Sequence, residues 1–198
     1  MDNLPEFKKF QKIPRLSRDI IITEKIDGTN GVIYIDEQNN IFAGSRNRWL
    51  DVHNDNYDFC NWVMQNKEEL LKLGQGYRYG EWMGKGINRG YGLDEKRFYL
   101  FNVNKWWDRR NGKLKEESKQ EYCPECCYVV PILYEGDWIE ETASELIYKP
   151  DSILIMLSNN GSYVSPGFMK PEGIIIYHKA GKYLFKKTIE NDDKRKNE

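Results

Sequence analysis

The stretch "DIIITEKIDGTNGVIYID", residues 19–36, predicts two strands joined by a charged turn. Residues 20–23 and 32–35 are apolar or β-branched, as in buried strands. Between them Lys25 lies between Glu24 and Asp27, and Gly28 follows. A surface hairpin needs no lysine between two carboxylates at the end of a buried strand. A reactive amine does need such surroundings, because neighbouring charges and burial set its pKa. The pattern alone leaves both interpretations open.

Composition points to one domain without an overall affinity for polyanions. The chain has 198 residues with a net charge of −1, so a nucleic-acid partner would need a locally basic groove. Its 13 Tyr, 8 Phe and 6 Trp are enough for a core or for stacking surfaces. It has no long apolar run and no signal-peptide pattern at its start, which predicts a cytoplasmic protein without a membrane segment.

Periodicity and turn residues predict the other elements. We expect an α+β domain over residues 1–190, built on antiparallel strands, and a flexible tail over 191–198. The expected helices cover residues 55–73 and 136–149. The expected strands cover residues 41–44, 77–83, 97–103, 172–178 and 182–188, and residues 84–92 and 107–121 are expected to form loops.

The cysteines form a cluster, "CPECC" at 123–127, with Cys60 far away in the sequence. Two cysteines at this spacing are half of many structural zinc sites. The second half is missing, because the two histidines are also distant in the sequence. The sequence therefore favours reduced thiols over a metal site at Cys123, Cys126 and Cys127.

Six short motifs occur in one order along the chain: "EKIDG" at 24–28, "GSRNRWL" at 44–50, "YGEWMG" at 79–84, "FYLFNV" at 98–103, "PEGIII" at 171–176 and "LFKKT" at 184–188. The series resembles the lysine nucleotidyltransferase superfamily of polynucleotide ligases and mRNA capping enzymes. Within it, the chain is most similar to ATP-dependent RNA ligases of the phage type. The resemblance implies a nucleotidyltransferase domain of antiparallel sheets with flanking helices, an ATP-grasp-like ligase fold.

The resemblance also implies a reaction. Lys25 would take AMP from ATP as a covalent lysyl-AMP, with Mg²⁺ or Mn²⁺ as metal. AMP would pass to the 5′-phosphate of an RNA, and a 3′-hydroxyl would then displace it. A virus-encoded protein acting in the host cytoplasm fits the same resemblance.

The resemblance assigns roles to individual residues. The catalytic set is Lys25, Glu172, Lys186 and Lys187. The nucleotide-binding set is Glu24, Ile26, Arg46, Glu81, Phe101 and Lys186. The RNA-binding set is Asn30, Arg46, Arg48, Lys85 and Arg89. The metal ligands are Glu172 and, through water, Glu81.

Strand alternation refines two of these roles. The family has two lysines separated by one residue, whereas Lys186 and Lys187 are adjacent. Adjacent side chains on a strand point to opposite faces, so only one of the two should face the site, and we favour Lys186. Phe101 should share a strand face with Tyr99 and stack on adenine.

Three alternatives stay open: a capping-type guanylyltransferase, a DNA ligase of the same superfamily, and a non-catalytic nucleic-acid-binding module. The sequence ends soon after Lys186, so we also expect no separate C-terminal domain. A protein partner would then replace the surface that such a domain supplies in relatives.

Overall fold

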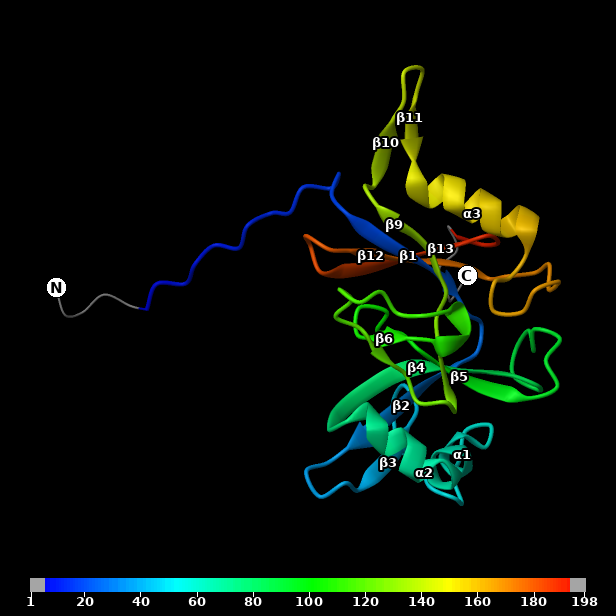
Figure 1. The fold of residues 1–198 in the computed structure, drawn as a ribbon. Coiled ribbons are helices and arrows are strands. Elements are labelled where there is room, and N and C mark those ends of the chain that lie inside the picture. Colours follow the sequence, from blue (N-terminus) through cyan, green and yellow to red (C-terminus); the bar gives the residue numbers. More distant parts are fainter. Residues whose placement is uncertain (1–5, 193–198) are drawn as a thin grey trace.

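The computed structural model describes residues 6–192. It contains two larger sheets that lie at different levels of the molecule (Figure 1). The first sheet has the order β13-β12-β1-β9 and consists of β1 (Ile20–Lys25), β9 (Ile132–Gly136), β12 (Gly173–His178) and β13 (Tyr183–Thr188). The second has the order β3-β2-β4-β5-β8 and consists of β2 (Thr29–Ile35), β3 (Ile41–Gly44), β4 (Gly76–Gly84), β5 (Lys96–Leu100) and β8 (Cys127–Val129).

Short elements complete the described chain. Two small ribbons pair β6 (Trp106–Trp107) with β7 (Glu121–Tyr122), and β10 (Ile139–Glu141) with β11 (Leu146–Tyr148). The helices are α1 (Phe59–Gln65), α2 (Lys67–Leu70), α3 (Lys149–Asn160) and the 3₁₀ turns η1 (Leu71–Leu73) and η2 (Arg109–Asn111). All neighbouring strands are antiparallel except in the pairs β5–β8 and β6–β7, so the predicted α+β fold with antiparallel sheets is confirmed.

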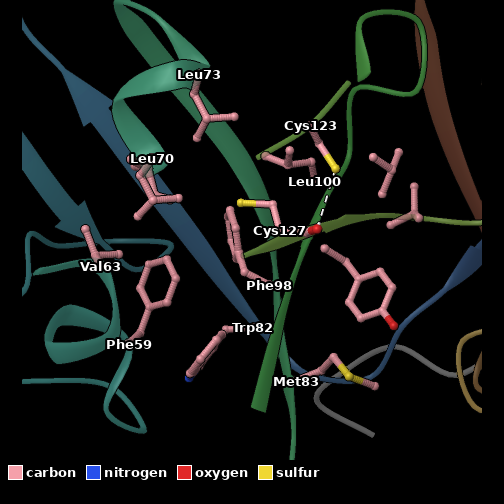
Figure 2. Packing of buried hydrophobic residues seen from close by; sticks show 14 of the residues in the cluster. Phe59, Val63, Leu70, Leu73, Trp82, Met83, Phe98, Leu100, Cys123 and Cys127 are labelled. Atoms are coloured by element: carbon pink, nitrogen blue, oxygen red, sulfur yellow. Dashed lines mark hydrogen bonds between the residues drawn. The ribbon is translucent and has the colours of Figure 1, made fainter. Parts of the chain in front are cut away.

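Each sheet has its own apolar cluster. In the second sheet Trp82 and Phe98 pack with Phe59 of α1, and Leu70 and Leu73 lie in the same cluster (Figure 2). In the first sheet two isoleucines of β1 and two of β12 pack with Leu157 of α3; they are Ile20, Ile22, Ile174 and Ile176. Burial of these side chains, worth about 1.5–3 kcal/mol each, fixes which face of each sheet is covered by a helix.

The alternation of side chains along each strand shows which residues lie on the face opposite each cluster. In β1, Ile20 and Ile22 belong to the cluster beneath α3, so Ile21, Thr23 and Lys25 lie on the opposite face. In β2, Ile33 and Ile35 are buried in the larger cluster, so residues 30, 32 and 34 lie on its other face.

One predicted helix is wrong. Residues 139–148 form the hairpin β10–β11, and the helix begins only at Lys149, with a proline in its first turn. Thr142 determines this outcome, because its hydroxyl accepts hydrogen bonds from the amides of Ser144 and Glu145 and stabilises a turn. Pro150 is the start signal that the prediction placed after the end of the helix.

Two other predicted elements are shorter than expected. The helix over 55–73 is interrupted at Asn66, whose side-chain amide donates to the carbonyl of Trp62 at 2.8 Å. The strand over 97–103 ends at Leu100, because Asn102 accepts backbone hydrogen bonds from Lys105 and Trp106 and forms a turn. Phe101 therefore lies after the strand, and its predicted alternation with Tyr99 is wrong.

None of the helices between residues 6 and 192 is long and apolar enough to cross a membrane. Residues 193–198 of the predicted flexible tail, and residues 1–5 of the predicted domain, lie outside the described part of the chain.

Candidate functional site

A cavity of about 1050 Å³ lies between the free faces of the two sheets. It is larger than most small-molecule sites, which measure about 300–1,000 Å³. The first sheet contributes Thr23, Lys25, Ile175 and Lys186 to its wall, and the second contributes Asn30, Tyr77, Tyr79 and Glu81. The cavity therefore has room for a nucleotide and for the end of a second substrate.

Lys25 ends β1 and contacts Glu172 in this cavity. Lys25 pairs in register with Gly173 of β12, which places the preceding residue, Glu172, beside it. The ammonium group donates to Oε2 of Glu172, and the two side chains are only 22% and 21% exposed. At Gly173 a Cβ would lie 2.2 Å from the carbonyl oxygen of Lys187, so glycine is needed for strands β12 and β13 to pair this closely.

Glu81 holds the loop that follows Lys25. Its carboxylate accepts a hydrogen bond from the amide of Gly28 at 3.1 Å and one from the side chain of Asn30 at 3.0 Å. Burial raises the pKa of Glu81 to about 7, against the hydrogen bonds and the charge of Lys25, which lower it. A Cβ on Gly28 would lie 2.4 Å from the carbonyl oxygen of Trp82, so only glycine allows this loop to approach β4.

The raised pKa of Glu81 predicts a pH-dependent effect of Glu81→Gln on stability. The folded state binds this proton more tightly than the unfolded state, so wild-type stability falls as pH rises from about 4.5 to about 7. Glutamine does not titrate. Relative to the wild type, Glu81→Gln should therefore gain up to about 3 kcal/mol between pH 5 and pH 8. Urea unfolding of both proteins across this range measures the difference, and a difference that does not change with pH would contradict it.

Glu24 borders the cavity, but its carboxylate binds a distant segment. Oε1 accepts from the hydroxyl of Ser162 at 2.6 Å, and Oε2 accepts from the amides of Tyr163 and Val164 at 2.7 and 3.2 Å. The residue is 1% exposed, and burial raises its pKa. The carboxylate thus fixes β1 to the segment after α3, a contact that the sequence did not indicate.

The two adjacent lysines of β13 lie on opposite faces, as alternation predicts. Lys186 pairs with Ile175 and lines the cavity. Lys187 pairs with Ile174 of the buried cluster, and its ammonium lies 2.9 Å from Asp151 of α3. Lys186 is therefore the lysine that shares the cavity with Lys25.

Three more of the predicted nucleotide-binding residues line the cavity: Ile26, Arg46 and Phe101. Ile26 is buried, whereas Arg46 is exposed and Phe101 is 42% exposed. An exposed aromatic ring and an exposed guanidinium at one cavity can contact a base and a phosphate.

The structure does not bring the other predicted RNA-binding residues into the cavity. Arg48 donates to the carbonyl of Asn54 at 2.6 Å, and Lys85 is exposed outside the cavity wall. Arg89 binds Asp27 at 3.0 Å and the carbonyl of Lys170 at 3.0 Å. Arg48 and Arg89 therefore stabilise loops of this protein in the described structure.

Sequence reasoning missed residues that hold the loop after Lys25. Asn88 donates to the carboxylate of Asp27 and to the carbonyl of Gly28, and the hydroxyl of Tyr91 accepts from the amide of Asp27 at 2.9 Å. Both lie in the glycine-rich loop 84–92, which the sequence indicated only as an RNA-facing segment. Lys105 also lines the cavity, and no motif pointed to it.

The cysteine cluster is separate from this cavity. Cys123 and Cys127 are buried, and the thiol of Cys123 lies 3.5 Å from the carbonyl oxygen of Cys127 (Figure 2). Within residues 6–192 no three His, Cys, Asp or Glu side chains are grouped in a way that could hold a metal ion. The four cysteines form no disulfide in the described structure.

Comparisons with known proteins agree with this geometry. A family model described as RNA ligase matches residues 18–189, whereas no curated protein sequence matches the chain. Solved structures of Naegleria gruberi RNA ligase are similar: a variant without ligand (TM-score 0.58, 21% identity), a variant with ATP and Mn (0.58, 22%) and a variant with AMP and Mn (0.57, 21%). Each match covers 87% of this chain and 50% of the other, so the chain spans about half the length of these structures. Because the family model covers nearly the whole chain, this protein belongs to the RNA ligase family.

Proposed function

We propose that this chain is the nucleotidyltransferase unit of an ATP-dependent RNA ligase that works through a lysyl-AMP intermediate on Lys25. The observation that carries the proposal is the position of Lys25, in contact with Glu172 and in one cavity with Lys186 and Arg46. A primary amine surrounded by both a carboxylate and further cations suits attack on a phosphate ester, because the cations offset the negative charge of the substrate.

In the first step, the amine of Lys25 attacks the α-phosphorus of ATP. A nitrogen–phosphorus bond forms, the bond from the α-phosphorus to the bridging oxygen breaks, and pyrophosphate leaves. Lys25 must first lose a proton, and Glu172 is the acceptor in direct contact with it. Lys186 supplies positive charge on the same wall of the cavity.

The cavity supports one orientation of the nucleotide. The exposed ring of Phe101 would stack on adenine, and the carboxylate of Glu81 would accept a hydrogen bond from the ribose. Arg46, which also lines the cavity, would bind a phosphate or the ribose.

A divalent metal fits the donors that are present. Glu172, and Glu81 through water, offer carboxylate oxygens in the cavity. Within residues 6–192 no three acidic, histidine or cysteine side chains are placed so that they could hold a metal by themselves. Mg²⁺ and similar ions accept such sites, since they take one or two carboxylates and fill the other positions with phosphate oxygens and water. The metal would supply positive charge to the phosphates.

The later steps need an RNA end in the same cavity. AMP passes from Lys25 to the 5′-phosphate of RNA, and the 3′-hydroxyl of a second end then displaces AMP as the phosphodiester forms. Asn30 lies beside Glu81 on the cavity wall, where its amide can contact the 5′-phosphate.

Incubation with α-³²P-ATP or α-³²P-GTP in the presence of Mg²⁺, followed by denaturing electrophoresis, tests the proposal. We expect label from ATP and, after addition of 5′-phosphorylated RNA, a joined product. Label from GTP alone would indicate a capping-type enzyme. Measurement of the intact mass first shows whether the purified protein already carries AMP on a lysine. If it does not, absence of label from both nucleotides would indicate a non-catalytic binding module.

The two lysines of β13 provide a matched pair of variants. Lys186→Ala removes a cation from the cavity, and we expect it to slow label transfer from ATP by about 100-fold or more. Lys187→Ala removes a cation bound to Asp151 on the other face and should slow the transfer less than about threefold. Equal losses in the two variants would contradict the assignment of Lys186.

A further inference from the structure

Five aromatic side chains form a continuous exposed surface on the second sheet, which we call the aromatic platform: Tyr34, Phe42, Trp49, Tyr77 and Tyr79. Four of them are between 44% and 55% exposed, and Tyr34 is half-buried. A contiguous exposed apolar patch on a folded domain marks an interaction surface.

The rings contact one another in a defined order. Tyr79 and Tyr77 lie with centroids 6.0 Å apart and planes only 8° apart. Tyr77 lies 4.5 Å from Tyr34 and 6.3 Å from Trp49, with an angle of 26° to the tryptophan. Phe42 completes the row at 6.0 Å from Tyr34 and 6.1 Å from Trp49. The platform is therefore fixed by its own contacts.

The platform is continuous with the wall of the cavity. Tyr77, Tyr79 and Glu81 alternate along β4 and point to one face. Across β2 they pair with Tyr34, Val32 and Asn30, so one sheet face carries the rings at one end and Glu81 and Asn30 at the other. Tyr77 and Tyr79 line the cavity themselves.

A single loop links the platform to a cation at the cavity. The chain leaves β3 at Gly44, passes Arg46, which lines the cavity, and returns to Gly44 through the bridge with Trp49. A Cβ on Gly44 would lie 3.1 Å from the indole of Trp49, so the ring packs tightly on the strand. Aromatic rings beside an arginine combine base stacking with phosphate binding.

We propose that the aromatic platform binds the unpaired bases of the RNA strand whose end lies in the cavity. This inference rests on the proposed function, because it takes the cavity as the place where that end reacts. A strand that leaves the cavity past Arg46 meets Tyr79 and Tyr77 first, and then the other three rings. Bases stack on aromatic side chains of sheet surfaces in this way in other RNA-binding modules.

Trp49→Ala and Phe42→Ala test the proposal, since neither residue belongs to the cavity wall. The probe is a 12-nucleotide single-stranded RNA with a 5′-hydroxyl, a fluorescein-blocked 3′ end and no ATP, measured by fluorescence anisotropy. Each variant should raise the Kd by about 5- to 100-fold. Trp49→Phe should stay within about threefold of the wild type, because the stacking ring is kept.

Tyr148→Ala is the matched control, since Tyr148 is a 51% exposed aromatic residue in β11, outside the platform. It should bind the probe as the wild type does. An unlabelled blunt duplex of the same length should compete more weakly than the unlabelled single strand, because its bases are not free to stack. Equal competition would overturn the proposal.

Label transfer from ATP to Lys25, measured on the same proteins, separates this inference from the proposed function. Weak RNA binding by the two variants with no label on the wild type would support the platform and reject the ligase reaction. Wild-type RNA binding by both variants would overturn the platform whatever the label shows. If light scattering showed a dimer for the wild type and a monomer for the two variants, with RNA binding unchanged, the platform would instead be a contact surface for a second copy of the chain.

Discussion

Lys25→Ala should abolish the covalent adenylate, with label from ATP reduced by more than about 1,000-fold. The reason is chemical, because alanine offers no nucleophile. Among residues 6–192 the cavity wall has two other lysines, Lys105 and Lys186, which lie on separate segments. Neither of these contacts Glu172 in the described structure, whereas Lys25 does. Denaturing electrophoresis after incubation with α-³²P-ATP measures the loss.

Lys25→Arg separates charge from nucleophilicity. Arginine keeps a cation beside Glu172, but its guanidinium stays protonated and cannot attack phosphorus. It should therefore fail as completely as alanine. Both variants should still seal an RNA whose 5′ end already carries AMP, since that step no longer uses the lysine. Label on either variant would show that another residue accepts AMP.

Glu24→Ala should lower the free energy of unfolding by about 2–4 kcal/mol. The change leaves the hydroxyl of Ser162 and the amide of Tyr163 without their acceptor, in an interior where each unsatisfied group costs about 1–3 kcal/mol. The amide of Val164 loses one of its two acceptors and keeps the hydroxyl oxygen of Ser162 at 3.1 Å. Relief from the desolvation of the buried carboxylate, which raises its pKa, offsets part of this loss. Urea unfolding at pH 7 measures the change.

Two further variants serve as comparisons for the stability of Glu24→Ala. Glu24→Gln keeps one acceptor oxygen and should fall between the wild type and Glu24→Ala. Glu135→Ala removes a carboxylate whose side chain is 53% exposed and paired with Lys179, and should change stability by less than about 1 kcal/mol. If Glu24→Ala were as stable as Glu135→Ala, the three hydrogen bonds would contribute nothing.

The strands that build the site could be predicted because their patterns are local. The predicted strands alternate or run apolar between turn residues, and each contains or lies within a strand of the structure: residues 20–23, 32–35, 41–44, 172–178 and 182–188. The hairpin at 139–148 could not be predicted in this way, because Trp138, Thr142 and Leu146 are also four residues apart, as in a helix. Hydrogen bonds from the turn to Thr142 decided between the two, and spacing does not report them.

The same distinction between local patterns and distant contacts separates the site residues whose positions could be predicted from those whose positions could not. Alternation distinguished Lys186 from Lys187, since it depends only on the strand that carries them. Glu24 was expected to contact the nucleotide, but its partners lie 138–140 residues away in the sequence and come from a helix end that was not predicted. Arg48 and Arg89 were expected to bind RNA, and in the described structure both donate to carbonyl groups of loops whose course depends on the tertiary fold.

The contact between Lys25 and Glu172 has a consequence for the order in which the protein acquires its chemistry. The two residues are 147 positions apart, so strand β12, which brings Glu172 to β1, is synthesised long after Lys25. A ribosome adds residues at about 5–20 per second, so the lysine exists for several seconds before its partner can reach it. Such distant pairings also form slowly. A nascent or truncated chain that ends before residue 172 therefore lacks the partner of Lys25. If the proposed reaction is correct, we expect such a chain to take no AMP from ATP.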